Sequence, residues 1–185
     1  MKRLILTGKL LLAVLTLEVL SGCASSMMLK AETKLEPGPD YAVVNFIRPS
    51  SFGGAIKFGI WDKDNFIGIL TPKNYIQYKA SPGEHMFMAR AENWAVLKAT
   101  VAAGKTYYIL GEPRMGAWKA RVALTVAEPN DPKVQKWMEK LTPTTVDPAQ
   151  KDAYVQRTVE DVRTAVKNVE TGSVPYEVMK VTDGR

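Results

Sequence analysis

Residues 41–48 have the sequence YAVVNFIR, and this stretch opens a series of short runs rich in β-branched and aromatic residues. The runs continue as far as position 127 and are separated by turn-forming residues such as Ser81-Pro82-Gly83. Each run is too short for a typical helix, and its residue types favour extended backbone. We therefore predict strands near residues 41–48, 55–61, 65–70, 75–79, 85–91, 95–101, 106–110 and 118–127.

Seven or eight short strands at this spacing predict a mainly β fold, specifically an antiparallel β-sandwich over residues 41–128. The composition agrees with this prediction. The chain has 185 residues, of which 46% are hydrophobic and 24% charged, so it has the balance of a globular domain with a buried core. This balance argues against a disordered chain and against a multi-span membrane protein.

The pattern changes after Glu128, where two Asp-Pro pairs occur. Asp131-Pro132 and Asp147-Pro148 each combine a favoured N-cap residue with proline at the first helical position. We predict one helix ending near Leu141 and a longer one ending near Glu170, which together form a helical segment over 129–172. Residues 173–185 carry only weak signals and are expected to form a poorly specified tail.

The N-terminus has the pattern of a secretory signal. Lys2 and Arg3 precede an apolar run over residues 10–20, which is shorter than the ~20 residues that a membrane-spanning helix needs. The run ends in Leu20-Ser21-Gly22-Cys23, and this sequence resembles the lipobox of bacterial lipoproteins. The resemblance implies removal of residues 1–22 as a signal peptide and attachment of acyl chains to Cys23.

Two or more acyl chains anchor a protein stably to a bilayer. Ala24 follows the cysteine, and by the same resemblance it implies sorting to the outer membrane, with the protein facing the periplasm. Residues 23–40 are polar and contain Pro37-Gly38-Pro39, so we expect a flexible tether that reaches at most ~55–60 Å when fully extended.

A second resemblance concerns the domain itself. The run FIRPSSFGGA at residues 46–55, Gly68 and the sequence SPGEH at residues 81–85 resemble a β-sandwich domain of unknown function that occurs in small envelope lipoproteins. The proline-glycine turn before His85 is also similar to PEGA-type modules. The resemblance covers residues 41–110 and implies a fold and a location, but no activity.

Few residues have the chemistry of a catalytic or metal site. A single cysteine and a single histidine exclude internal disulfides and multi-histidine metal sites. The sequence His85-Met86-Phe87-Met88 contains soft copper ligands, but strand alternation puts Met86 and Met88 on the face opposite His85. We therefore expect these methionines to pack in the core, and we predict no metal, no cofactor and no catalytic residues.

Two features are candidates for interaction. Helical spacing places a stripe of valines on one face of the second helix: Val155, Val159, Val162, Val166 and Val169. The stripe either docks on the chain's own sandwich, which we favour, or binds a partner helix. The guanidinium of Arg48 can bind a carboxylate, either within the fold or on a ligand.

These observations predict a lipid-anchored, non-catalytic binding or structural module of the cell envelope. Its expected partner is membrane lipid, through Cys23, and the candidates for a second partner are an envelope protein or a glycan. Aromatic residues such as Phe58, Trp61, Tyr75 and Tyr107 are interleaved with basic ones and could stack on sugars, but we favour the interpretation that alternate strand positions face the core and water. Nucleic acid is not expected as a partner. The alternative is an enzyme, or an enzyme accessory, that acts on envelope polymer, and acids converging around Asp62 or Glu84 would favour it.

Overall fold

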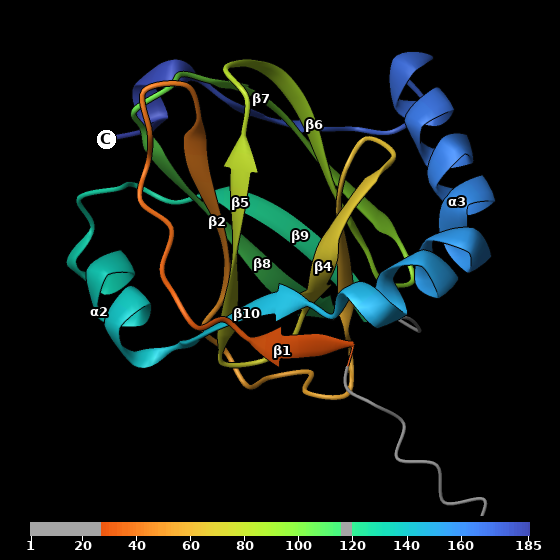
Figure 1. Cartoon of the computed structure of the whole chain (residues 1–185). Coiled ribbons are helices and arrows are strands. Elements are labelled where there is room, and N and C mark those ends of the chain that lie inside the picture. The colour runs from red at the N-terminus through yellow and green to blue at the C-terminus, as the bar shows by residue number, and fades with distance from the viewer. Residues whose placement is uncertain (1–26, 116–119) are drawn as a thin grey trace, which may run out of the picture.

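The structure, a computed structural model, describes residues 27–115 and 120–185, and this part of the chain is mainly β (Figure 1). One sheet has six strands, in the order β1 (Met28–Lys30), β10 (Thr142–Val146), β5 (Asn74–Ala80), β2 (Ala42–Arg48), β8 (Thr106–Met115) and β9 (Ala120–Val126). The other has five, in the order β11 (Glu177–Met179), β7 (Trp94–Val101), β6 (Gly83–Arg90), β3 (Phe58–Asp62) and β4 (Asn65–Leu70). The mainly β class is thus confirmed.

The two sheets enclose a common apolar core. Phe46 of β2 and Phe87 of β6 are fully buried, and their rings meet edge to face with centroids 5.2 Å apart. Strand alternation explains this contact, since every second side chain of β2 and β6 points into the space between the two sheets. The arrangement is similar to a β-sandwich.

Both sheets are mixed, so the prediction of a purely antiparallel arrangement is not met. β2 pairs with β8 in parallel, as do β10 with β5 and β11 with β7. Consecutive strands that are neighbours in one sheet are antiparallel: β3 with β4, β6 with β7 and β8 with β9. The turn at Ser81-Pro82-Gly83 instead connects β5 and β6, which belong to different sheets. The parallel pairs join strands that are far apart in sequence, and no local signal identifies such partners.

The segment expected to be a flexible tether is largely attached to the domain. Met28–Lys30 forms β1, which pairs with β10, and the amide of Leu35 donates to the side-chain oxygen of Gln77 at 2.8 Å. Two further strands were also missed. β10 lies inside the predicted helical segment, where Pro143 weakens the strand signal, and β11 lies in the tail that was expected to be poorly specified.

Both predicted helices are confirmed, including their first residues. α2 covers Pro132–Lys140 and α3 covers Pro148–Glu170. The Asp131 side chain accepts from the Lys133 amide at 2.8 Å, and the Asp147 side chain accepts from the Ala149 amide at 3.0 Å. These caps satisfy amides that have no partner within the helix. Among the described residues, no helix is both long and apolar enough to cross a bilayer.

The valine stripe of α3 packs on the outer face of the five-stranded sheet. Val162 and Val169 are buried there with Trp61 and Met88, and Val155 and Val166 are partly buried against the same group. Val159 is half-buried and lies outside this cluster. The stripe therefore docks on the chain's own domain, the alternative that the sequence favoured.

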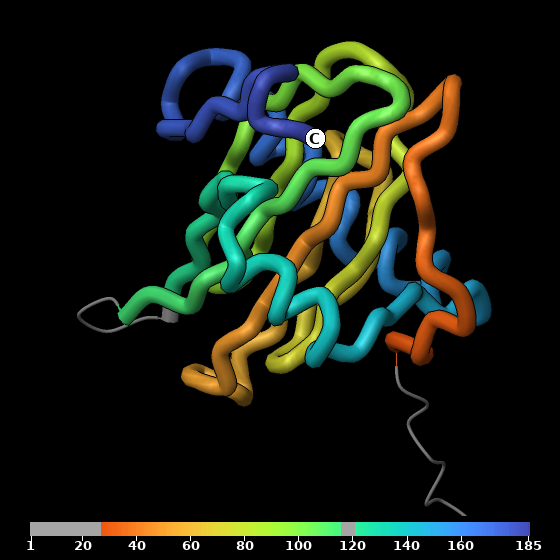
Figure 2. Tube along the Cα trace, turned by 90° about the vertical axis from the view of Figure 1, so that its left-hand side faces the viewer, coloured from red at the N-terminus to blue at the C-terminus, as the bar shows by residue number. Residues whose placement is uncertain are grey.

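Several connections meet at one end of the molecule. Figures 1 and 2 both place the loop between β2 and β3 at the same end as the start of β1. The turn between β4 and β5 lies at the same end, because Arg48 at the end of β2 is paired with Asn74 at the start of β5. β8 runs parallel to β2, so its carboxyl end extends toward the same end. We call the loop 49–57, the turn 71–73, the start of β1 and the carboxyl end of β8 the basal end.

Replacing Val162 tests the docking of α3. Val162→Ala leaves a cavity in a fully buried site, so we expect the free energy of unfolding to fall by about 2 kcal/mol. Gln156→Ala, at an exposed position of the same helix, is the control and should change it by less than about 0.5 kcal/mol. Urea unfolding measures both, and equal effects of the two variants would contradict the packing described.

Candidate functional site

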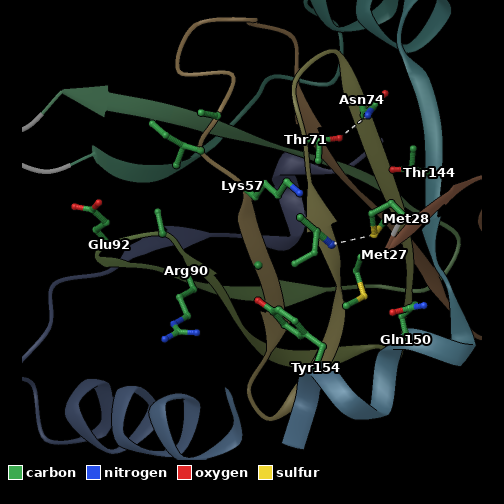
Figure 3. A pocket seen from close by; sticks show the side chains of 15 residues that line it. Met27, Met28, Lys57, Thr71, Asn74, Arg90, Glu92, Thr144, Gln150 and Tyr154 are labelled. Atoms are coloured by element: carbon green, nitrogen blue, oxygen red, sulfur yellow. Dashed lines mark hydrogen bonds between the residues drawn. The ribbon is translucent and has the colours of Figure 1, made fainter. Parts of the chain in front are cut away.

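A cleft of about 750 Å³ opens at the basal end (Figure 3). Its walls come from the start of β1, the end of the loop before β3, the end of β4, the turn between β6 and β7, and the first turns of α3. A cleft of this size can hold a small ligand or part of a larger one. It is therefore the candidate binding site of the domain.

The mouth of the cleft carries two cations and one acid. Lys57 is exposed, and Arg90 forms an ion pair with Asp161 of α3 while its guanidinium lies 5.9 Å from the centre of the Trp94 ring. Glu92 lines the same region. The two cations can bind an anionic group, and Arg90 is already held in place by α3 and Trp94.

Neutral polar groups and apolar side chains line the deeper part. Asn74 donates to the hydroxyl of Thr71 at 2.5 Å, and the Met28 sulfur accepts from the Ile69 amide at 3.1 Å. Tyr154 stands over Phe66 with ring centroids 4.5 Å apart. Burial raises the pKa of the Tyr154 phenol, although Arg90 opposes this rise, so the phenol remains a neutral hydrogen-bonding group.

Glycine 59 makes room for Tyr154 beside β3. A Cβ atom at this position would lie 2.8 Å from the Tyr154 hydroxyl, closer than side chains tolerate. The cleft thus depends on contacts between segments that are far apart in sequence. The sequence does not identify these residues as one site, because each is unremarkable in its own segment.

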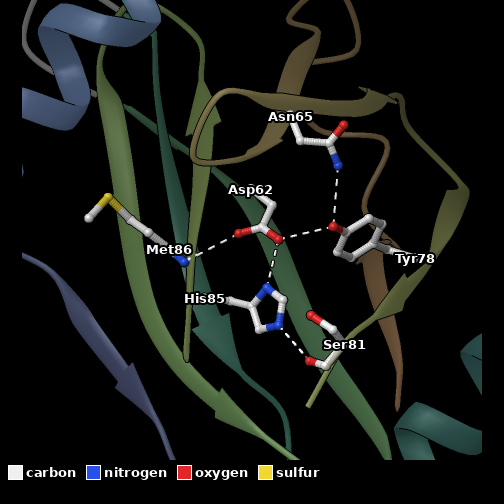
Figure 4. Close-up of polar contacts among 6 residues, drawn as sticks. All are labelled: Asp62, Asn65, Tyr78, Ser81, His85 and Met86. Atoms are coloured by element: carbon white, nitrogen blue, oxygen red, sulfur yellow. Dashed lines mark hydrogen bonds and ion pairs between the residues drawn. The ribbon is translucent and has the colours of Figure 1, made fainter. Parts of the chain in front are cut away.

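A second polar cluster surrounds the only histidine of the chain (Figure 4). His85 Nδ1 lies 2.6 Å from Asp62 Oδ2, and His85 Nε2 lies 2.8 Å from the carbonyl oxygen of Ser81. Tyr78 donates to the same Asp62 oxygen at 3.0 Å and accepts from Asn65 at 3.2 Å. The His85 and Asp62 side chains are only 8% and 11% exposed.

Both ring nitrogens of His85 face acceptors, an arrangement that the doubly protonated imidazolium satisfies. The hydrogen bond to Asp62 raises the pKa of His85 above 6.5; burial opposes the rise and the Ser81 carbonyl adds to it. Burial and the Asp62 charge also raise the pKa of Tyr78 to about 12. Because a backbone carbonyl occupies Nε2, this cluster has the geometry of a structural ion pair and not of a nucleophile with its base.

Arg48, a predicted interaction residue, lies fully buried at the end of β2. Its guanidinium donates to the carbonyl oxygens of Ile56 at 2.5 Å, Gly53 at 2.7 Å and Phe52 at 3.2 Å. It also lies 4.2 Å from the centre of the Phe58 ring. Arg48 thus binds the loop that follows it, and none of the acceptors is a carboxylate.

The other residues considered from the sequence pack inside the domain or lie outside the described residues. Met86 and Met88 share one face, as strand alternation predicted, but the prediction that they pack in the sandwich core is wrong: they lie on the outer face under α3, and Phe87 points into the core between the sheets. Several aromatic residues considered for glycan stacking are fully buried, namely Phe58, Trp61, Tyr75 and Tyr107. Cys23, the predicted lipid-attachment residue, lies outside the described residues. Within the described ranges, no three His, Cys, Asp or Glu side chains are grouped so as to hold a metal ion.

Comparison with known proteins returns no match. No protein-family model, no curated protein and no solved structure is similar to this chain.

The His85–Asp62 pair predicts a pH-dependent stability. A histidine whose pKa is raised by folding stabilises the native state fully below its unfolded value of 6.5, and this contribution disappears as the pH rises through the raised pKa. His85→Gln should therefore lower the free energy of unfolding by about 2 kcal/mol near pH 5.5 and by much less near pH 9.

Chemical denaturation at both pH values measures this difference. The control is Asn65→Ala, which removes only the neutral bond to Tyr78 and should cost the same at both pH values. A cost of His85→Gln that does not vary with pH would show that the imidazole is neutral in the folded state.

Proposed function

We propose that the protein is a lipid-anchored, non-catalytic binding module of the bacterial envelope, and that the basal cleft is its binding site. The observation that carries the proposal is the position of Met27, which lines the cleft and lies four residues after Cys23. Acyl chains on Cys23 would hold the opening of this cleft beside the bilayer. The lipobox-like sequence and the resemblance to envelope sandwich domains support the same location.

The geometry of the acids supports a non-catalytic role. Hydrolysis of a glycan typically requires two carboxylates on either side of the bond. Glu92 is the one acid among the cleft-lining residues described, and Asp62 is bound to His85 and Tyr78 elsewhere. Glu84 lines a separate depression together with Lys63 and Lys98. Glu92 and Asp161 both line a depression between α3 and the turn after β6, but Asp161 is held in an ion pair with Arg90.

Mass spectrometry of the protein purified from membranes tests the anchor. We expect the mature polypeptide to begin at Cys23 and to carry the added mass of acyl chains. Cys23→Ser should abolish this mass and the partition into detergent, whereas Ser25→Ala should change neither. An intact Met1 together with an unmodified Cys23 thiol would overturn the proposal.

A further inference from the structure

The distance between the anchor and the folded domain is short. β1 begins at Met28 and Met27 lines the cleft, so only residues 24–26 separate Cys23 from the described domain. Four Cα-to-Cα steps extend at most ~14 Å. This is far less than the ~55–60 Å reach of the tether expected from the sequence. An acylated Cys23 therefore keeps the basal end close to the lipid surface.

The basal end also carries exposed apolar side chains. Phe52, in the loop after β2, is 55% exposed, and Met115, the last residue of β8, is 77% exposed. β8 runs parallel to β2, so its carboxyl end extends toward the same end of the molecule. Exposed large apolar side chains at loop tips are suited to insertion into the interfacial region of a bilayer.

Arg48 holds the loop that displays Phe52. The buried guanidinium binds the carbonyl oxygens of Phe52 and Gly53, and the Ser50 hydroxyl accepts from the Phe52 amide at 3.0 Å. Gly53 has a φ of 62°, a left-handed conformation that suits glycine. The loop is thus fixed with the Phe52 ring outward, and little ordering entropy is lost on insertion.

The charges of this end complement an anionic lipid surface. Lys57 lies at the mouth of the cleft and Lys73 in the turn between β4 and β5, and both are exposed. Arg114 and Arg121, which are neighbours on β8 and β9, are exposed toward the same end. Three acids lie near these cations: Glu92 lines the cleft, Glu112 is paired with Arg114, and Asp147 caps α3 while its amide donates to the Met27 carbonyl oxygen. The four cations Lys57, Lys73, Arg114 and Arg121 outnumber these three acids.

We propose that the basal end is a membrane-contact surface: Phe52 and Met115 insert into the interface of an anionic bilayer, and Lys57 and Lys73 bind its phosphate groups. The cleft then opens onto the headgroup layer. This inference rests on the proposed lipid anchor at Cys23, which brings the surface to the bilayer but does not itself fix the orientation of the domain.

Spin labels on the acylated full-length protein in lipid nanodiscs test the orientation. Phe52→Cys and Val178→Cys place the label at positions of equal exposure, 55% and 56%, one at the basal end and one on β11. In discs containing phosphatidylglycerol, we expect the label at 52 to be about fivefold less accessible to a water-soluble nickel chelate than the label at 178. Equal accessibility, or protection at 178 instead, would overturn the proposal.

Charge reversal tests the electrostatic part. Lys57→Glu with Lys73→Glu should remove most of the protection at position 52, because each cation near an anionic surface contributes about 1 kcal/mol. The matched control, Lys63→Glu with Lys167→Glu, changes two exposed cations away from the basal end and should leave the protection unchanged. Protection that survives the basal reversal would overturn the role assigned to Lys57 and Lys73.

The same experiment distinguishes a missing lipid anchor from a wrong orientation of the domain. A protein without acylation at Cys23 would not enter the nanodiscs, and its free Cys23 thiol would take a label in every variant. That outcome would overturn the proposed function, and the contact surface with it. An acylated protein with an accessible label at 52 would overturn the contact surface alone.

Discussion

The buried guanidinium of Arg48 connects the core of this domain to its basal end. Burial of a cation is costly, and here three backbone carbonyl oxygens and the face of the Phe58 ring compensate for the lost water. Burial also lowers the pKa of Arg48 below its ordinary value. Because the acceptors belong to one loop, the hydrogen bonds of the two terminal guanidinium nitrogens also fix that loop, while the buried Nε has no hydrogen-bond partner. The shape of the cleft wall at Ile56 and the outward position of Phe52 both follow from it.

Local signals in the sequence predicted a large part of the fold. Asp131 and Asp147 marked the starts of α2 and α3, because capping involves only the first turn of a helix. The run 65–70 coincides with β4, since a short turn and β-forming residues specify a hairpin arm locally. Val162 and Val169 indicated the buried face of α3 through helical spacing alone. In each case, the information lies within a few residues.

The remaining features depend on contacts between distant segments. β1, β10 and β11 are short edge or added strands whose sequences become extended through pairing with a partner far along the chain. The tether interpretation of residues 23–40 was wrong for Met28–Lys30 for this reason. Local sequence does not predict the cleft either, because Lys57, Arg90 and Tyr154 come together only when both sheets and α3 have assembled. Arg48 was recognised as a candidate, but its acceptors are carbonyl oxygens, which any sequence supplies.

The two polar regions of the domain, the His85–Asp62 cluster and the cleft, differ in what they can do. The His85–Asp62 pair resembles part of a catalytic triad when it is viewed as a list of residues, yet its second nitrogen binds the Ser81 carbonyl. The cleft is less conspicuous in sequence but is open, carries two cations and lies next to the segment that leads to Cys23. We therefore propose that the protein acts at the lipid surface, through the cleft and not through the histidine cluster.

Neutron reflectometry of the acylated protein on a supported anionic bilayer measures this arrangement most directly. A domain held by residues 24–26 with its basal end on the lipid predicts continuous protein density from the headgroups outward, without a water layer between them. A solvent-filled gap of tens of ångströms, as a long flexible tether would produce, would contradict the account.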